Sequence, residues 1–328
     1  MKRGYVFWRS AAIITLAAGS ISFATAQQYP TKAITLIVPA AAGGPTDTVS
    51  RMIAQSMGRE LKGQIVVENA GGAGGTIGAA RVARAQGDGY TLYVYHIGQS
   101  TFPALYRKLT FDPINDFEPI GRITDVPMTL VAKRELAAND FKELMAWIKS
   151  SGNKVALATA GLGSVSNLCA LLLRQSFGAD PTIVPYKGTG PAMNDLLGGQ
   201  VDVLCDQTTN TTPHIKSGRI KAFGVTTMTR VGALKDLPTL DELGLKGFDL
   251  SAWHALWAAK GTPKPIVDEL TKALQRALKD PLVVQRFADL GTEPVKESEA
   301  TPTALRSHLK AEIERWGPII RAAGQFAD

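Results

Sequence analysis

Long hydrophobic runs are scarce in this chain, which argues against an integral membrane protein. One apolar run, Ala11–Phe23, is too short for a confident membrane span, and no later segment approaches 18 uninterrupted apolar residues. Three basic residues within positions 2–9 precede this run, and the small residues Ala24-Thr25-Ala26 follow it. This order predicts a secretory signal peptide over residues 1–26 and a mature protein in the periplasm, with an uncleaved anchor as the less favoured alternative.

Cysteine is also scarce. The chain has two, Cys169 in a helix-like segment and Cys205 at the end of a strand-like one. Export permits a disulfide, but a chain of this length does not need one for stability. We therefore expect two buried free thiols, with a disulfide as the alternative.

A strong excess of charge of one sign is missing as well. Removal of residues 1–26 takes away three of the 36 basic residues and no acidic ones, which leaves 33 basic against 29 acidic residues. Nucleic-acid-binding domains usually carry a stronger positive balance. The charge therefore gives no indication of nucleic acid as a partner.

Sequence motifs for catalysis or cofactor binding are missing too. There is no Gly-x-Ser-x-Gly and no P-loop, and the four histidines lie far apart without metal-ligand spacing. Residues 161–166 nearly match a dinucleotide fingerprint, but Ser166 replaces the third glycine and Asp180 precedes the following strand instead of closing it. We expect no enzyme, no cofactor and no metal; an exported α/β hydrolase with a triad assembled only in space is the alternative.

What the chain does have is a glycine-rich turn, residues 38–47, between a strand-like and a helix-like segment. Residues 34–38 form an apolar run typical of a buried parallel strand, and apolar residues recur at helical spacing from Val49 to Met57. The first amides of a helix have no partner inside it, and the helix dipole adds partial positive charge there. Because no Lys or Arg lies between Val38 and Asp47, we expect the backbone itself to hold an anion.

Strand-like and helix-like segments alternate along the rest of the chain, which predicts an α/β fold with a parallel sheet. Roughly 300 mature residues exceed one hydrophobic core, so two domains are expected. A second strand, glycine turn and helix occurs around Gly163, and two such turns facing each other would form a cleft between two lobes. Strands are expected at residues 34–38, 65–67, 90–95, 155–159, 183–184, 201–205, 221–226 and 255–259, and helices at 76–85, 141–149, 164–177, 192–197, 213–217, 265–279 and 302–323, with irregular segments at 103–119 and 234–248.

Three polar residues near these turns are ambiguous. His96, at a strand end, is as well explained by a ligand contact as by a local hydrogen bond. Asp206, also at a strand end, is placed to accept a hydrogen bond from a ligand hydroxyl or from a neighbouring loop amide. Asp47 is better explained as a helix cap or loop brace than as a contact, since a carboxylate repels a bound anion.

The sequence resembles the substrate-binding proteins of tripartite tricarboxylate transporter systems, often called the Bug family. The resemblance covers essentially the whole mature chain and rests on ordered motifs. These are Ile34-Thr35-Leu36-Ile37-Val38-Pro39 running into Gly43-Gly44-Pro45-Thr46-Asp47, Glu68-Asn69-Ala70-Gly71-Gly72-Ala73-Gly74-Gly75-Thr76-Ile77-Gly78, Asp88-Gly89-Tyr90-Thr91-Leu92, Val184-Pro185-Tyr186-Lys187-Gly188, the run from Asp195 to Asp202, and Gly261-Thr262-Pro263.

The resemblance implies a two-lobed periplasmic binding fold (type II, Venus flytrap) with a mainly parallel sheet in each lobe. Residues 27–128 and 250–328 would form the first lobe and residues 129–249 the second. An organic acid would be captured between the lobes by a monomer and delivered to a membrane permease of one large and one small subunit. The loops matching Ala41–Asp47 and Gly161–Asn167 would hold a carboxylate through backbone amides, hydroxyls and water.

The predicted ligand-binding residues combine these loops with the two strand-end residues. They are Ala41, Ala42, Gly43, Gly44, Thr46, Asp47, His96, Gly161, Gly163, Ser164, Ser166, Asn167 and Asp206. Replacing Ser164 by Ala is expected to cost about 1 kcal/mol of affinity, and Gly163→Val to weaken binding with little loss of stability.

Two positions depart from the family pattern. Ala40 stands where an aromatic residue is frequent, and Asn167 where a histidine is common. Because a smaller residue leaves space for a larger ligand, we hypothesise a dicarboxylate, including aromatic acids of the phthalate type. A receptor that presents the acid to a membrane sensor kinase is the alternative role.

Overall fold

The computed structural model describes Met1 and residues 29–327. The predicted signal peptide lies outside the described residues apart from Met1. Among residues 29–327, no helix combines the length and apolar character that crossing a lipid bilayer requires.

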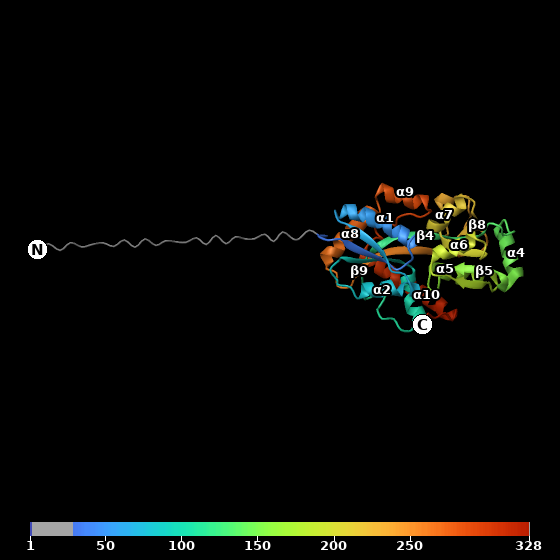
Figure 1. The fold of residues 1–328 in the computed structure, drawn as a ribbon, viewed down its shortest axis with the longest axis horizontal. Helices are drawn as coiled ribbons and strands as arrows, with labels where there is room; N and C mark the ends of the chain where they lie inside the picture. Colours follow the sequence, from blue (N-terminus) through green and yellow to red (C-terminus); the bar gives the residue numbers. More distant parts are fainter. Residues whose placement is uncertain (2–28, 328) are drawn as a thin grey trace.

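Nine strands form one continuous sheet that runs through two lobes lying side by side along the long axis of the molecule (Figure 1). The order of hydrogen-bonded neighbours is β2-β1-β3-β9-β4-β7-β5-β6, and β8 pairs with β4 off this path. The strands are β1 Ile34–Val38, β2 Ile65–Asn69, β3 Thr91–His96, β4 Phe117–Lys133, β5 Ala156–Thr159, β6 Thr182–Pro185, β7 Val203–Gln207, β8 Ile220–Val225 and β9 Ser251–Ala259.

Strand β4 belongs to both lobes. Its first part pairs with β9 as far as Pro127, and from Met128 onward it pairs with β7 and β8. We call strands β1, β2, β3 and β9, together with the first part of β4 and their helices, the first lobe. Strands β5, β6, β7 and β8, together with the rest of β4, form the second lobe. The lobe boundaries expected near residues 128 and 250 stay a prediction.

The expectation of a mainly parallel sheet in each lobe is confirmed, with one strand in each lobe, β9 in the first and β4 in the second, running against the others. Pairs β1–β2, β1–β3, β5–β6 and β5–β7 are parallel, but the pairs made by β4 and the pair β3–β9 are antiparallel. The physical reason is the connection between lobes. Strand β4 leads out of the first lobe and β9 leads back into it, so the two run in opposite directions.

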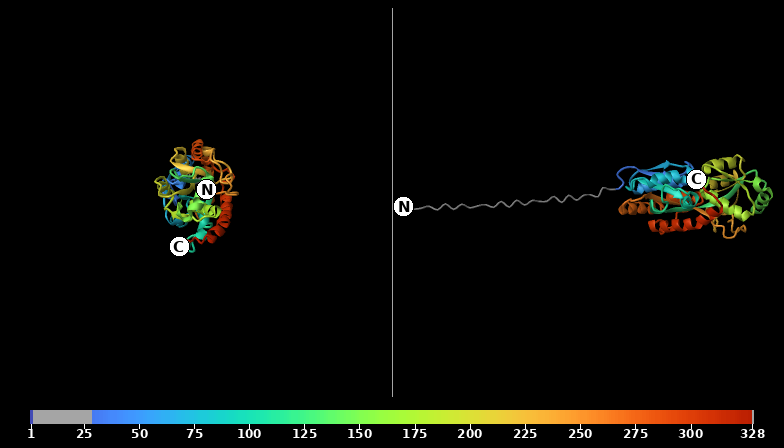
Figure 2. Two further views of the ribbon diagram at one scale, coloured as in Figure 1. Left: turned by 90° about the vertical axis from the view of Figure 1, so that its right-hand side faces the viewer. Right: turned by 90° about the horizontal axis from the view of Figure 1, so that it is seen from below.

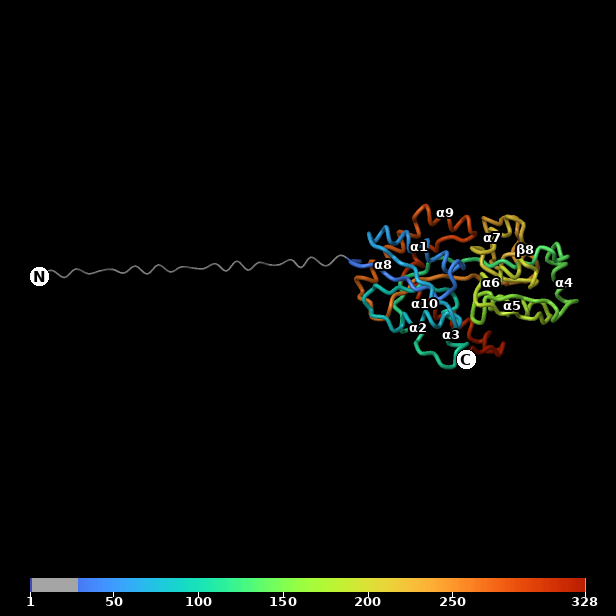
Figure 3. The backbone as a smooth tube through the Cα atoms, viewed as in Figure 1, coloured from blue at the N-terminus to red at the C-terminus, as the bar shows by residue number. Residues whose placement is uncertain are grey.

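Helices cover both faces of this sheet, and the right-hand view in Figure 2 shows the same two groups of elements side by side. The helices are α1 Pro45–Glu60, α2 Thr76–Ala83, α3 Gly98–Leu105, α4 Phe141–Ser151, α5 Val165–Phe177, α6 Thr189–Leu197, α7 Thr208–Lys216, α8 Lys264–Ala277, α9 Pro281–Asp289 and α10 Pro302–Ala322, with short 3-10 turns at Ala73–Gly75, Gly152–Lys154 and Gly232–Leu234. The backbone trace in Figure 3 brings the end of the chain, after α10, back to the junction of the lobes.

The environment of strand β1 explains its run of apolar residues. Ile34 and Leu36 pack in one core cluster with residues of α1 and α8, whereas Ile37 packs in the other cluster with Tyr93 of β3. Alternate side chains point to opposite faces of a strand. Because both faces of β1 are covered, nearly every position along it is apolar.

Four elements differ from the sequence-based expectation. The segment 103–119, expected to be irregular, holds the last turn of α3 and the start of β4. Helix α7 begins at Thr208 instead of near residue 213, and α9 follows α8 with no counterpart in the expected elements. Proline explains why α9 was missed: Asp280-Pro281 resembles a helix end, but Asp280 caps α9 by accepting from the Leu282 amide, and Pro281 occupies its first position.

The expectation of two free thiols is also wrong. Cys169 of α5 and Cys205 of β7 form a disulfide, with their Cα atoms 6.2 Å apart. Helix α5 packs directly on β7, which brings the two side chains together across the interface. This packing is a tertiary contact, and the separation of 36 residues between the two cysteines does not predict it.

Candidate functional site

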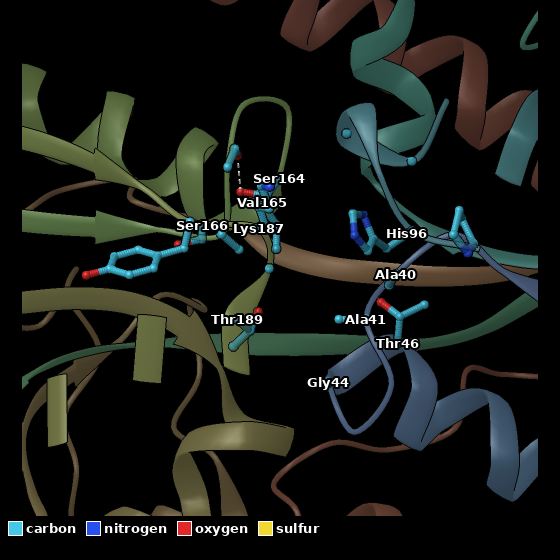
Figure 4. A pocket seen from close by; sticks show the side chains of 18 of the residues that line it. Ala40, Ala41, Gly44, Thr46, His96, Ser164, Val165, Ser166, Lys187 and Thr189 are labelled. Atoms are coloured by element: carbon cyan, nitrogen blue, oxygen red, sulfur yellow. Dashed lines mark hydrogen bonds between the residues drawn. The ribbon is translucent and has the colours of Figure 1, made fainter. Parts of the chain in front are cut away.

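A cavity of about 700 Å³ lies between the two lobes. Figure 4 shows loop residues of the second lobe on one side of it and those of the first lobe on the opposite side. Its walls are residues 39–41, 44–46, 71–75, 95–96, Tyr106, 160–162, 164–166, 186–189, 206–207 and Ala327.

The first wall is the start of α1. Gly44 is its N-cap without any side-chain cap, and Pro45 occupies the first helical position. Within the described chain the backbone N–H of Thr46 has no hydrogen-bond partner. This amide is therefore free for an acceptor, with the positive end of the helix dipole behind it.

Asp47 lies behind this loop and does not line the cavity. Its Oδ2 accepts from the Gly43 amide (2.8 Å) and from Arg51 Nε (2.9 Å), and its Oδ1 accepts from Asn69 Nδ2 (3.0 Å). Burial alone would raise the pKa of Asp47, but the hydrogen bonds from Arg51, Gly43 and Asn69 outweigh it and lower the pKa. The carboxylate thus fixes the shape of the turn, which includes Gly43 at φ +75°.

Two buried histidines set the polarity of the next wall. The His96 Nδ1 accepts from the Gly98 amide (2.9 Å), so its Nε2 carries the proton of the neutral ring and is a donor. In His254, Nδ1 lies 2.9 Å from the Ala252 carbonyl and must carry the proton, so Nε2 accepts from the Thr46 hydroxyl at 3.3 Å. Both rings stay neutral, because burial lowers the pKa of His96 well below its ordinary value and that of His254 to about 4.

Across the cavity, α5 begins with a fully used cap. The Ser164 hydroxyl donates to the Gly161 carbonyl (2.6 Å) and accepts from the Asn167 amide (3.1 Å). The amides of Val165 and Ser166 have no partner in the described chain. Binding at this loop therefore falls to those two amides, and the expected effect of Ser164→Ala is a loss of the helix cap instead of a lost ligand contact.

Asp206 and Gln207 form the floor on the second lobe. Asp206 is 1% exposed, and it accepts from Asn210 Nδ2 at 2.7 Å and more weakly from the Thr189 hydroxyl at 3.5 Å. Burial raises the pKa of Asp206 to about 7, although the hydrogen bonds from Asn210, Gln207 and Thr189 oppose the rise. The Gln207 Oε1 atom is buried and has no partner among the described residues.

The positive charge around the cavity comes mainly from backbone amides at the beginnings of helices. Helices α1 and α5, and also α6 and α7, begin at residues that line it or directly follow the lining. Among the lining residues, Lys187 is the one with a cationic side chain, and it is exposed at the rim. The arrangement suits an anion that enters from solvent and is held by amides.

The structure brings eight of the thirteen predicted residues to the cavity wall and leaves five out of it. The eight are Ala41, Gly44, Thr46, His96, Gly161, Ser164, Ser166 and Asp206; the five are Ala42, Gly43, Asp47, Gly163 and Asn167. Gly163 packs inward, since a Cβ there would lie 2.6 Å from a Leu105 methyl carbon at φ +76°. Its replacement by Val should therefore disturb the fold itself, contrary to the expected small loss of stability.

Sequence reasoning missed several lining residues from other segments: Gly71–Gly75, Tyr95, Tyr106, Tyr186–Thr189 and Gln207. Two of these segments carried a signal, because the glycine run at 71–75 and the Tyr186-Lys187-Gly188 turn stood among the family motifs. Tyr106 carried none. Within residues 29–327, no cluster of three or more His, Cys, Asp or Glu side chains is arranged to hold a metal ion.

Comparison with known sequences gives consistent matches. Residues 49–325 match the family described as tripartite tricarboxylate transporter family receptor. A UPF0065 protein from the TAR-I ttuE-ttuC' intergenic region of Agrobacterium vitis is 54% identical over 90% of this chain and 86% of its own length. Protein BugT of Bordetella pertussis is 35% identical over 95% of both chains.

Solved structures agree. The periplasmic binding protein BugD is 49% identical with a TM-score of 0.87, covering 91% of this chain and 100% of its own. MatC from Rhodopseudomonas palustris with bound malate is 41% identical with a TM-score of 0.84, covering 89% and 100%. Rpa4515 of R. palustris with adipate is 31% identical with a TM-score of 0.86, covering 90% and 98%.

Proposed function

This chain belongs to the tripartite tricarboxylate transporter receptor family and is a periplasmic solute-binding receptor of the Bug type; from that premise we propose that it captures a dicarboxylate between its lobes. One carboxylate is held by the free amides of Thr46, Val165 and Ser166 together with His96 Nε2–H. The second lies toward Lys187 and the start of α6. Lys187 then adds a charged side chain to a site in which backbone amides make most of the hydrogen bonds to the ligand.

The observation that carries this proposal is the convergence of helix beginnings from both lobes on one cavity. A ligand that touches both walls stabilises the closed arrangement, because only that arrangement offers both sets of donors. The ligands bound in the related structures support the ligand class, since malate and adipate are both dicarboxylates. They differ in length, so the cavity of this family accommodates more than one chain length.

Isothermal titration of the mature protein tests the ligand class. The panel is succinate, malate, adipate and phthalate, with acetate and benzoate as the monoacids of matched chemistry. We expect a dicarboxylate to bind at least about tenfold more tightly than any monoacid, because the second carboxylate adds a charged hydrogen bond. Tight binding of a monoacid alone contradicts the proposal, whereas preference for phthalate supports the aromatic form of the hypothesis.

We further propose that the receptor acts as a monomer, catalyses no reaction and delivers its ligand to a permease of one large and one small subunit. Deletion of the gene should abolish uptake of the ligand. Loss of induction with intact uptake would favour presentation to a sensor kinase instead. Turnover of the bound acid by the purified protein would reveal an enzyme.

A further inference from the structure

We propose that the ligand carries a hydroxyl group next to a carboxylate, and that Asp206 accepts the hydrogen bond of this hydroxyl. The cavity then selects a hydroxylated dicarboxylate over its unsubstituted analogue. This inference rests on the proposed function, since it concerns the same cavity. The malate and adipate of the related structures leave the question open, because one has a hydroxyl and the other has none.

Asp206 is an unusual group to find in a cavity for an anion. It lines the wall, is 1% exposed and forms no ion pair with any residue of the described chain. Its two side-chain partners, Asn210 and Thr189, are neutral donors. At pH 8, above its pKa of about 7, Asp206 is ionised, and a ligand carboxylate placed against it would meet a like charge, so this part of the wall is not a carboxylate subsite. It is an acceptor, and it needs a donor from the ligand.

Two further acceptors line the same cavity, Gln207 beside Asp206 and Thr46 on the opposite side. Gln207 Oε1 is buried without a partner in the described residues. The Thr46 hydroxyl hydrogen is committed to His254 Nε2, which leaves only lone pairs of its oxygen for the cavity. An unsubstituted dicarboxylate dianion has no donor for any of these atoms. A site built around such acceptors rejects an analogue that lacks the hydroxyl.

The surroundings of Asp206 favour a neutral donor over a cationic one. Thr189 and Thr208 are the first residues of α6 and α7, so two helix beginnings with partial positive charge flank the carboxyl group. Lys187 lines the same cavity. An ammonium group would be repelled by these charges, whereas a hydroxyl is not. The chemistry therefore points to a hydroxy acid and away from an amino acid.

A matched series of four-carbon acids tests the inference: succinate, both enantiomers of malate, and aspartate differ only at carbon 2. Adipate and 2-hydroxyadipate form the corresponding pair for a longer chain. By titration at pH 8, where Asp206 is ionised, we expect one hydroxy acid to bind at least about tenfold more tightly than its unsubstituted partner. In Asp206→Asn, an amide N–H replaces an acceptor oxygen, and the preference should shrink to within about threefold.

Lys187→Gln is the matched control, because it removes a charge from the same cavity without touching the acceptors. It should weaken the hydroxylated and unsubstituted acids by the same factor and leave their ratio unchanged. Equal binding of each pair by the wild-type protein, an unchanged ratio in Asp206→Asn, or tightest binding of aspartate overturns this inference alone. Failure of every dicarboxylate to bind overturns it together with the proposed function. Melting temperatures of both variants verify folding.

Discussion

Replacing Val165 by proline removes one amide hydrogen from the start of α5. Val165 is the first helical residue, where proline is well tolerated because its fixed φ suits the helix and the missing N–H has no partner there. Helix α1 already has Pro45 at the equivalent position. The preceding Ser164, at φ −70° and ψ 156°, has the extended conformation that a residue before proline requires.

The expected effect follows from the bond that is lost. A hydrogen bond to a charged group contributes about 1.5–3 kcal/mol, which corresponds to a rise in Kd of roughly 10- to 150-fold. Val165 is 2% exposed, so the substitution also removes apolar contacts. Val165→Ala is the control, because it loses the same side-chain contacts and keeps the amide.

Isothermal titration with the ligand that the wild-type protein binds best is the assay, and circular dichroism melts of both variants verify the fold. We expect Val165→Ala to bind within about threefold of the wild-type protein, well below one charged hydrogen bond, and Val165→Pro to bind at least tenfold more weakly. If the two variants bind alike, the amide of Val165 does not hold the ligand. The argument that free helix amides form the site would then fail.

Further predictions concern stability. Because burial raises the pKa of Asp206 to about 7, the folded protein keeps a proton that the unfolded chain releases near pH 4. The free energy of unfolding of the wild type should therefore fall as the pH rises from about 4 to about 7. Between pH 5 and pH 8, Asp206→Asn should melt several degrees higher than the wild type. Asp47→Ala should weaken ligand binding without touching the cavity, since the turn loses its bond to the Gly43 amide; hydrogen exchange of that amide should rise, and unchanged exchange would contradict the brace. Changing Cys169 and Cys205 together to Ala should cost about 2–4 kcal/mol of unfolding free energy in urea, the usual contribution of a disulfide, and an unchanged midpoint would refute it.

The first strand, turn and helix were predictable from sequence because their causes are local. The apolar run of β1 reflects burial on both faces, and the turn ends in Gly44 and Pro45, the N-cap and first residue of α1. Strand β4 was not predictable. Pro119, Gly121 and Pro127 interrupt its pattern, and they fit only because the register with β9 shifts between Pro119 and Gly121 and β4 changes partner after Pro127.

The residues of the site can likewise be separated into those that the sequence predicted and those that it did not. The residues at the loops that follow β1 and β5 were found, because the strand ends and helix starts there are visible in the sequence, whereas the loops that follow β2 and β6 were not predicted as parts of the site. Residues brought to the cavity by packing were missed, as with Tyr106, whose hydroxyl donates to the Ala73 carbonyl from a segment 33 residues away. The sequence also does not show which side chains already make hydrogen bonds within the protein. The Ser164 hydroxyl, for example, bonds to the Gly161 carbonyl and the Asn167 amide of its own loop.

The disulfide bears on when this receptor becomes competent to bind. Cys205 immediately precedes Asp206, and Cys169 lies one helical turn after Ser166, so the bond joins two parts of the cavity wall. The cytoplasm keeps thiols reduced. We therefore expect a newly made chain to lack this crosslink and to tighten its ligand pocket only after it has left the compartment of its synthesis, where premature capture of metabolites would serve no purpose.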